Sequence, residues 1–436
     1  MKSVVVFLGI PYAMPPIDDL RFKPPRPHKG WQLWQATDFG PACPQPARHV
    51  GGAQNVWEMD EDCLYLNVYT PSVSGAVVNK YPVIVYIHGG QFEHGASNQF
   101  PPHALVAWHE VVVVTFNYRL GALGFLSTGD EHSPGNYGML DQALAIRWVY
   151  ENAHVFNGDP RRITLWGVGA GAAAAGLHVL TPRTKDKVFG VFAQSGSALA
   201  DWAAIKHVLT PRTKDKVFGV FAQSGSALAD WAAIKLPEQA RNTSRVYAAR
   251  IACPNDNAFK LVDCLKKGRS FNELANQEIE VGQQFMDEQI RKYVHKYNFT
   301  LNPGGVFDAI QSQYTFWPDP TNTTMIREEY INFLSDSLYK APVDNMVKRM
   351  VLAGIPTYFY VMNTTVEAVR LPLWRQVPHG IDSLFLAGAP FMDKEFFPES
   401  MRVDKRAWTE GDRNMSEFFM KAVANFAHHG KPTPEV

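Results

Sequence analysis

The stretch Ile163-Thr-Leu-Trp-Gly-Val-Gly-Ala-Gly171 constrains the fold of this chain more than any other segment. Its first four residues favour a buried strand, and the glycines that follow favour a sharp turn into a helix. In a Gly-x-Ser-x-Gly turn of this kind, called a nucleophile elbow, the central serine attacks an acyl carbon. Here Gly167 and Gly171 are present, but the central position is Gly169, which has no side chain to act as a nucleophile. The sequence therefore predicts the frame of the elbow without its catalytic group.

Long apolar runs place this turn in an α/β fold. Residues 81–88 and 111–118 are continuous apolar segments, which is typical of strands covered on both faces of a parallel sheet. The same reasoning predicts further strands and two helices; the strands are 163–166, 188–193 and 356–361, and the helices are 138–156 and 172–180. Residues 255–350 are mostly polar and helix-patterned, and we expect a turn at Asn302-Pro-Gly-Gly to interrupt them.

Residues 178–206 are repeated without a change as residues 207–235. Two copies are too few for a solenoid, which needs about three stacked units. Each copy would supply one strand, and both cannot fill the same place in a sheet. We therefore expect one copy in the sheet and the other as an extruded or poorly packed insert, within a single domain that spans residues 1–436. A recent duplication or a faulty gene assembly explains such a copy more simply than a designed repeat does.

The composition is that of an ordinary globular protein. Apolar residues make up 46% of the chain and charged residues 19%, so disorder is not indicated. Lys+Arg and Asp+Glu number 42 each, and the net charge is therefore zero. A nucleic-acid-binding protein usually concentrates basic charge, and we expect no nucleic-acid partner.

Cysteines and glycosylation motifs favour an oxidising compartment. The four cysteines lie as two local pairs, Cys43 with Cys63 and Cys253 with Cys264, although the sequence alone allows three connectivities. Two short disulfide loops are the favoured interpretation, and unpaired thiols in a cytosolic protein are the alternative. Five Asn-x-Ser/Thr motifs argue against that alternative; they begin at Asn242, Asn298, Asn322, Asn363 and Asn414. We therefore expect a secreted or cell-surface glycoprotein.

The beginning of the chain shows neither a signal peptide nor a membrane anchor. Residues 1–8 contain a short apolar run, but no small-residue cleavage site follows it. No run of about 18 apolar residues occurs anywhere in the chain. We expect the domain to be incomplete at both ends.

Several dispersed stretches resemble the type-B carboxylesterase/cholinesterase family, and the likeness extends over nearly the whole length of the chain; the matching stretches are residues 7–13, 20–25, 61–69, 88–90, 117–125, 134–142, 158–160 and 377–380. The resemblance implies an α/β-hydrolase fold with a central, mostly parallel sheet flanked by helices. Within the family, residues 194–202 and 262–267 are most similar to the non-catalytic adhesion branch that includes neuroligins and gliotactin.

The resemblance also implies structural roles. The two local cysteine pairs would be the family's two short disulfide loops. Arg21 with Glu61, and Arg119 with Asp159, would form internal ion pairs that tie loops to the sheet. Breaking one side of a buried pair costs roughly 3–5 kcal/mol, so these residues are predicted to be structural rather than functional.

Acyl transfer needs a nucleophile, a histidine, an acid and an oxyanion hole, and the resemblance identifies only part of this set. His379 matches the family's catalytic histidine, but Gly169 leaves it nothing to deprotonate. No acid is identified, because the chain is shorter than the family between Cys264 and His379; Asp287 and Glu288 lie in this region without a supporting motif. Both Gly169 and His379 are therefore interpreted as vestigial.

Backbone N–H groups of Gly90, Gln91 and Ala170 would form the oxyanion hole. Active relatives carry a third small residue where this chain has Gln91, whose long side chain would crowd the pocket. Other nucleophile candidates have no Gly-x-Ser-x-Gly context and are expected to be turn or capping residues; they are Ser195, Ser197, Ser224 and Ser226.

Two other motifs favour different chemistry. Residues 167–172 also fit the dinucleotide-binding pattern Gly-x-Gly-x-x-Gly/Ala, with Asp186 about 20 residues further on. Asp186 precedes the next strand instead of ending it, and this interpretation is disfavoured. His428 and His429 lack partners at metal-ligand spacing and are expected to be solvent-exposed. No cofactor or metal is predicted.

The sequence thus predicts a catalytically inactive, esterase-like extracellular domain that acts in cell adhesion or junction assembly. Its partner would be an extracellular protein, either neurexin-like or a second copy of the chain, and helix-mediated homodimers are common in the relatives. One alternative is a carboxylic-ester hydrolase whose gene assembly is damaged. A second alternative is a small-molecule carrier that uses the vestigial pocket.

Overall fold

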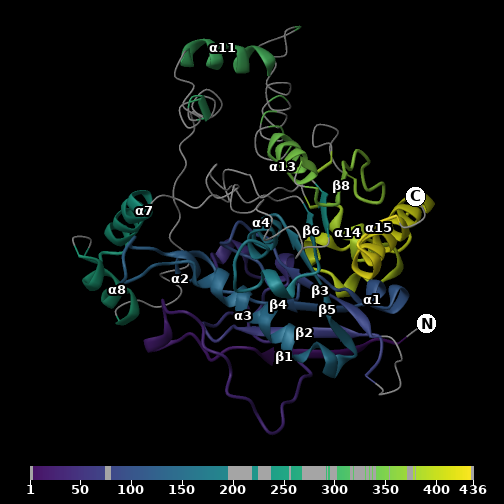
Figure 1. Ribbon diagram of the computed structural model, residues 1–436, viewed down its shortest axis with the longest axis horizontal. Coiled ribbons are helices and arrows are strands. Elements are labelled where there is room, and N and C mark those ends of the chain that lie inside the picture. Colours follow the sequence, from purple (N-terminus) through teal and green to yellow (C-terminus); the bar gives the residue numbers. More distant parts are fainter. Residues whose placement is uncertain are drawn as a thin grey trace.

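A computed structural model describes residues 3–73, 80–194, 219–223, 237–254, 257–267, 302–314, 340–352, 354–370 and 380–433, with isolated residues between 291 and 378. Eight strands form one sheet in the order β1-β2-β4-β3-β5-β6-β7-β8 (Figure 1). The strands are β1 Val5–Pro11, β2 Tyr65–Thr70, β3 Tyr81–Ile87, β4 Val112–Phe116, β5 Gly158–Val168, β6 Gly190–Gln194, β7 Gly219–Gln223 and β8 Thr357–Tyr360. β1 and β2 pair antiparallel at one edge, and the pairs from β4 to β8 are parallel. The predicted mostly parallel sheet is confirmed.

Helices cover both faces of this sheet. The α-helices are α1 His103–His109, α2 Gly121–Phe125, α3 Tyr137–Asn152, α4 Ala170–His178, α7 Pro237–Arg250, α8 Ala258–Lys267, α11 Pro303–Gln313, α13 Ala341–Leu352, α14 Ser383–Leu386 and α15 Glu410–His429. Short 3-10 helices lie between them; they are η1 Asp18–Leu20, η2 Ala47–His49, η3 Gly52–Gln54, η4 Ala153–Phe156, η5 Lys185–Lys187, η9 Ala389–Phe391, η10 Lys394–Phe396 and η11 Glu399–Met401. No helix within the described residues is long and apolar enough to cross a membrane.

The apolar runs of the sequence bury alternate residues in two separate cores. In β3, Val83 and Val85 belong to a core that includes residues of α3, α4 and α13. Ile84 and Tyr86 face the opposite core, with α1, α14 and α15. Because successive strand residues point to opposite faces, a strand covered on both sides must be apolar at nearly every position. This geometry explains why 81–88 and 111–118 read as continuous apolar segments.

Both copies of the repeat contribute a strand, which corrects the expectation that one would be extruded. The first copy forms β6, and the second forms β7 directly beside it, in parallel. β7 in turn pairs with β8. The expectation was wrong because it assumed one available place, whereas the parallel sheet extends by one strand to take the second copy.

Two helices depart from the sequence-based expectations. Asn302-Pro-Gly-Gly begins helix α11 and is not an interrupting turn, because the Asn302 side chain accepts a hydrogen bond from the Gly305 N–H at 2.9 Å and Pro303 occupies the first turn. Helix α15 was not predicted. It has its own sequence signal, a capping box in which Thr409 and Asp412 each bond the other's backbone N–H.

Candidate functional site

The sharp turn after β5 has the geometry of a nucleophile elbow. Gly169 links β5 to α4 with φ 55° and ψ −116°, a conformation that costs strain in residues with a side chain. A Cβ atom at Gly167 would collide with the backbone of Gly171, and one at Gly171 with the carbonyl oxygen of Ile87 in β3. The two flanking glycines therefore let α4 pack directly on the carboxyl ends of β3 and β5.

The three residues that were expected to form an oxyanion hole lie near the ends of β3 and β5. Gly90, Gln91 and Phe92 follow β3 with φ of 93°, 57° and 63°, and Ala170 is the first residue of α4. Among the described residues, the N–H groups of Gly90, Gln91 and Ala170 donate to no backbone carbonyl in the loops and turns. Gln91 is exposed. The expected oxyanion-hole residues thus lie in the loop after β3 and at the first residue of α4, near the carboxyl ends of the parallel strands, where α/β proteins bind ligands.

Two stacked aromatic rings, those of His88 and Tyr118, support the turn at Gly89 and Gly90. The ring centroids of His88 and Tyr118 are 4.3 Å apart, and both residues are buried. The Tyr118 hydroxyl donates to the His88 carbonyl oxygen at 3.0 Å, and His88 Nδ1 donates to the Gly89 carbonyl oxygen at 3.0 Å. Burial lowers the pKa of His88 to about 4, so its ring is neutral at physiological pH. His88 therefore supports the loop as a neutral packing residue.

Polar residues that the sequence analysis did not identify connect the elbow to α14. The Gly169 N–H donates to the carbonyl oxygen of Gln194 at 2.8 Å. The Gln194 amide accepts from Trp166 Nε1 at 2.9 Å and donates to Ser383 Oγ at 3.1 Å. Asp382 lies beside this group, and burial raises the pKa of its carboxyl to about 6. Only the pairing of distant segments brings these residues together, and no local motif marks them.

The remaining catalytic candidates lie outside the described residues. These are His379, the four serines of the repeat at 195, 197, 224 and 226, and the carboxylates Asp287 and Glu288. Their roles stay predictions.

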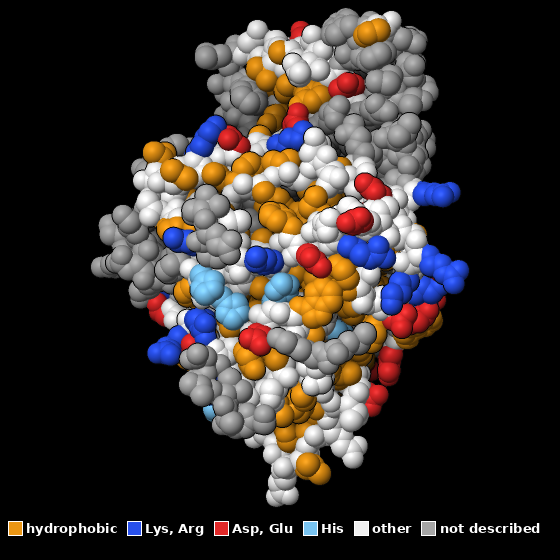
Figure 2. Space-filling view, turned by 90° about the vertical axis from the view of Figure 1, so that its right-hand side faces the viewer, with side chains coloured by type: hydrophobic (Ala, Val, Ile, Leu, Met, Phe, Trp, Pro, Cys, Tyr) orange, Lys and Arg blue, Asp and Glu red, His pale blue; other side chains and the backbone are white. Residues whose placement is uncertain are grey.

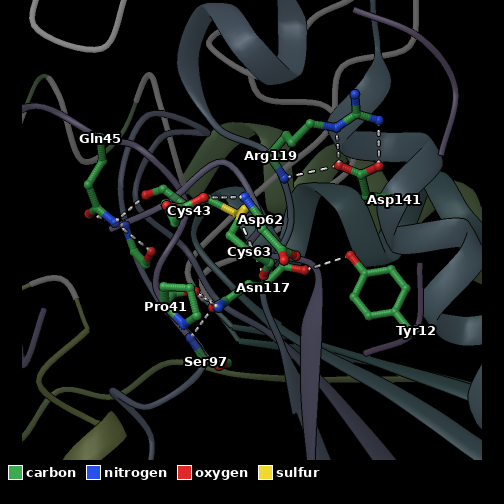
Figure 3. The surroundings of a disulfide bond; sticks show 12 residues. Tyr12, Pro41, Cys43, Gln45, Asp62, Cys63, Ser97, Asn117, Arg119 and Asp141 are labelled. Carbon is green, nitrogen blue, oxygen red and sulfur yellow. Dashed lines mark hydrogen bonds and ion pairs between the residues drawn. A yellow bond between two sulfur atoms is a disulfide. The ribbon is translucent and has the colours of Figure 1, made fainter. Parts of the chain in front are cut away.

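Both expected disulfides are present. Cys43 and Cys63 are bonded with a Cα–Cα distance of 5.0 Å, and Cys253 and Cys264 with one of 6.0 Å. Figure 3 shows how the loop of the first disulfide is fixed to its surroundings. The Gln45 side chain donates to the carbonyl oxygens of Cys43 and Gly95 at 3.1 Å each. The loop of the first disulfide is therefore anchored at Gly95, in the segment that follows the turn at Gly89 and Gly90.

The first of the two expected ion pairs is confirmed. Arg21 Nε donates to Glu61 Oε2 at 2.7 Å, and a second guanidinium nitrogen contacts the other carboxylate oxygen. Arg21 also donates to the carbonyl oxygens of Leu265 and Lys266 at 3.0 Å. The pair thus connects the N-terminal segment to the end of α8, next to the second disulfide.

The second expected pair, Arg119 with Asp159, is wrong. Arg119 instead binds Asp141 of α3 through two parallel bonds of 2.8 and 2.7 Å, and its backbone N–H donates to the same carboxylate at 3.1 Å (Figure 3). Asp159 pairs with the neighbouring Arg161 and Arg162 at 3.3 and 3.1 Å. The correction has a physical reason, because Arg119 is almost fully buried and needs a carboxylate within the core.

The glycosylation motifs fall in different settings. Asn363 and Asn414 are exposed, the second on α15. Asn242 lies in α7 with its side chain outside the described set, and Asn298 and Asn322 lie outside the described residues.

The structure also places the dinucleotide-like motif and the histidine pair. Asp186 is exposed in η5, before β6, and so does not end the strand next to β5 as the dinucleotide-binding pattern requires. His429 is exposed, but the expectation was wrong for His428, which is half-buried and donates from Nε2 to the His109 carbonyl oxygen at 3.0 Å.

Comparison with known proteins shows which proteins are similar to this chain in sequence. The model of the carboxylesterase family matches residues 1–208 and 270–436. Neuroligin-like protein glit-1 of Caenorhabditis elegans is 30% identical over 99% of this chain and 66% of its own length. Neuroligin-2 of Mus musculus is 28% identical over 100% of this chain and 58% of its own length, and mouse neuroligin-3 is 31% identical over 99% and 59%. The chain therefore spans about 58–66% of the length of these relatives.

Proposed function

Since the chain belongs to the carboxylesterase family, we propose that it is an esterase-like extracellular domain that has lost hydrolysis and acts in cell adhesion or junction assembly by binding another protein. The single observation that carries this proposal is the side-chain-free Gly169 in the elbow conformation. The similarity to neuroligins and to glit-1 supports the assignment to the adhesion branch of the family.

The chemistry at the elbow supports binding rather than turnover. An acyl-enzyme needs an oxygen, sulfur or nitrogen nucleophile within reach of a base, and Gly169 supplies none. The N–H groups of Gly90, Gln91 and Ala170 donate to no backbone carbonyl in the loops and turns of the described part of the chain, which leaves them suited to polarise a carbonyl oxygen. Donors without a nucleophile stabilise a bound carbonyl but form no covalent intermediate. The two disulfides fit the extracellular setting of the proposal.

An apolar face offers a surface for recognition. Figure 2 faces the side of the molecule on which α1, α14 and α15 lie in Figure 1, and hydrophobic side chains gather in its middle. Exposed aromatic residues include Trp108 of α1 and Phe418 of α15, together with Phe396 of η10, whose ring contacts His103 of α1. Contiguous exposed apolar surface commonly marks protein-interaction sites. This face is the proposed contact surface for the extracellular partner.

The loss of hydrolysis is tested by covalent labelling. The purified chain is incubated with a fluorophosphonate probe and, separately, with a p-nitrophenyl ester, beside an active carboxylesterase as control. We expect no adduct on any serine and no ester cleavage above buffer. A stoichiometric adduct, or turnover that the probe inhibits, would show that another residue serves as nucleophile and would overturn the proposal.

Recognition is tested with matched surface variants. Binding to a neurexin-like ectodomain and to the immobilised chain itself is measured for the parent, for Phe418→Glu and for Phe259→Glu. Phe418 and Phe259 are 56% and 63% exposed, but they lie on α15 and α8, on opposite sides of the molecule (Figure 1). We expect Phe418→Glu to weaken binding at least tenfold and Phe259→Glu to leave it unchanged. Equal effects would refute the proposed face, and a lack of binding to both probes would refute the adhesion role.

A further inference from the structure

The segment between η1 and the first disulfide presents large apolar side chains to solvent. Residues 23–39, the aromatic loop, lie beyond the edge strand β1 and form the lowest part of the molecule in Figure 1. Leu33 is 84% exposed, and Trp31, Trp34 and Phe39 are 41%, 39% and 41% exposed. Hydrophobic side chains are also visible at the lower end of Figure 2, which is turned about the vertical axis. Exposed apolar side chains that lie together commonly mark an interaction site, and this one is separate from the face formed by α1, α14 and α15.

The aromatic loop is fixed to β1, so its tip is held outward. Trp34 Nε1 donates to the carbonyl oxygen of Gly9 at 2.9 Å, and the Leu8 N–H donates to the carbonyl oxygen of Ala36 at 2.9 Å. The ring centroids of Trp31 and Trp34 are 5.7 Å apart, so the two rings support each other. A loop that is already ordered loses little conformational entropy when it binds. The exposed side chains are therefore presented in a fixed arrangement.

The charge of the aromatic loop is mostly positive. Lys23, Arg26 and Lys29 are all exposed, and Asp38 is the loop's one acidic residue, whereas the whole chain has equal numbers of basic and acidic residues. Arg26 lies at the base of the loop, because its carbonyl oxygen accepts a hydrogen bond from the Met14 N–H at 2.8 Å. An apolar tip that contains tryptophan, with basic side chains at its base, is typical of segments that bind the interface of a lipid bilayer.

We propose that the aromatic loop binds the surface of a phospholipid membrane, with Trp31, Leu33 and Trp34 in the interface and Arg26 and Lys29 at the headgroup phosphates. The indole N–H of Trp34 already has its acceptor within the chain, so this ring can leave water without an unpaired donor. Basic side chains add attraction to anionic headgroups, and stable attachment to a membrane needs two such contributions.

The geometry favours a membrane over two other occupants. The planes of Trp31 and Trp34 are tilted by 51°, so the two rings do not form a flat platform on which a sugar could stack. A stable protein interface buries about 800 Å² on each partner, which is more than the tip of one loop presents. A bilayer needs only the tip, because its interface takes up a projecting apolar group from any direction within the plane.

Flotation of the full chain with vesicles tests the apolar tip, with vesicles of phosphatidylcholine mixed with phosphatidylserine. Leu33→Gln changes the most exposed apolar side chain of the loop. Leu352→Gln is the matched control, since Leu352 is 87% exposed at the end of α13, far above the loop in Figure 1. Burial of a leucine side chain raises affinity about tenfold or more, so Leu33→Gln should lower partition into vesicles by at least about tenfold and Leu352→Gln should leave it unchanged. Absence of flotation by the parent, or equal partition of the two variants, would overturn the proposal.

Two further variants separate the charged and the aromatic contributions. A chain with both Arg26→Gln and Lys29→Gln should bind vesicles that contain phosphatidylserine more weakly than the parent at low salt, and should match the parent on phosphatidylcholine alone. Lipids with brominated acyl chains should quench the tryptophan fluorescence of the bound parent. Replacing Trp31 and Trp34 by leucine should reduce this quenching, because these are the rings that enter the interface. Undiminished quenching in that variant would contradict the proposed depth of the tip and overturn the proposal.

The membrane proposal is independent of the adhesion proposal, and a variant of each surface tells them apart. Trp108 and Trp31 are 42% and 41% exposed, and Trp108 belongs to the face assigned to the extracellular partner. Trp108→Gln should weaken binding to that partner and leave flotation unchanged, whereas Trp31→Gln should do the reverse. Binding of a soluble glycan or of an ectodomain through Trp31, without any binding of vesicles, would assign the loop to another class of partner and overturn the membrane proposal.

Discussion

Replacement of Asp141 by asparagine tests the corrected ion pair most directly. Asp141 is fully buried, and its carboxylate accepts three hydrogen bonds from Arg119, which is itself 3% exposed. The substitution keeps the shape of the side chain but removes its charge, so the guanidinium would remain in the core without a counter-ion. Breaking one side of a buried pair costs about 3–5 kcal/mol. At roughly 2 °C per kcal/mol for a large domain, the melting temperature should fall by about 6–10 °C.

Asp159→Asn is the matched comparison, because the family resemblance had assigned Asp159 to the same arginine. Asp159 bonds Arg161, whose side chain is 87% exposed, and the more covered Arg162. Pairs at the surface contribute about 0–1 kcal/mol. Thermal and urea unfolding of both variants should therefore show a much larger loss for Asp141→Asn. An equal loss, or a larger one for Asp159→Asn, would refute the assignment of the buried pair.

Burial raises the pKa of Asp382 to about 6 from an ordinary value near 4, so its protonated form adds stability below about pH 4, and this contribution is lost as pH rises through 6. Asp382→Asn should therefore raise the free energy of unfolding by up to about 3 kcal/mol at pH 7.5 and change it little at pH 4, in urea titrations at both pH values. Gly171→Ala places a methyl group against the carbonyl oxygen of Ile87 in β3 and should lower the free energy of unfolding by at least about 1–3 kcal/mol. At Gly304 in α11, the atom nearest to an added Cβ is 3.8 Å away, so Gly304→Ala should be neutral or stabilising. Thermal melts compare the two, and equal shifts would contradict the close packing of α4. Replacing Cys253 and Cys264 by serine opens a loop of 11 residues and should cost about 2–3 kcal/mol, which non-reducing melts against the parent would measure.

Local patterns predicted the parts of the site that depend on neighbouring residues. Gly167, Gly169 and Gly171 identify the elbow because the strand, the turn and the helix follow one another along the chain. The same holds for the two disulfides, which close loops of 20 and 11 residues. The partner of Arg119 was mistaken because Asp159 was taken from the family resemblance, and the sequence does not say which carboxylate shares the buried environment of Arg119.

Other features depend on the packing of segments that are far apart in the sequence. Gln194 meets Ser383 across 189 residues, and neither residue lies in a motif that announces the contact. Asp382 has an unusual pKa only because α14 is buried against the sheet, which no property of residue 382 alone reveals. Where the catalytic histidine was expected, at 379, the prediction rests on family resemblance alone.

The sequence by itself predicted the central strands, the glycine turn at residues 167–171 and the repeat, because periodicity, glycine spacing and identity are properties of the chain read in one direction. Only the tertiary structure decided which carboxylate neutralises Arg119, which polar groups meet behind the elbow and how the repeat is accommodated. The physical reason is the same in each case: a charge, an amide or a strand edge is satisfied by whatever the fold brings beside it. The second copy of the repeated segment became a strand because β6 on one side and β8 on the other pair with its backbone.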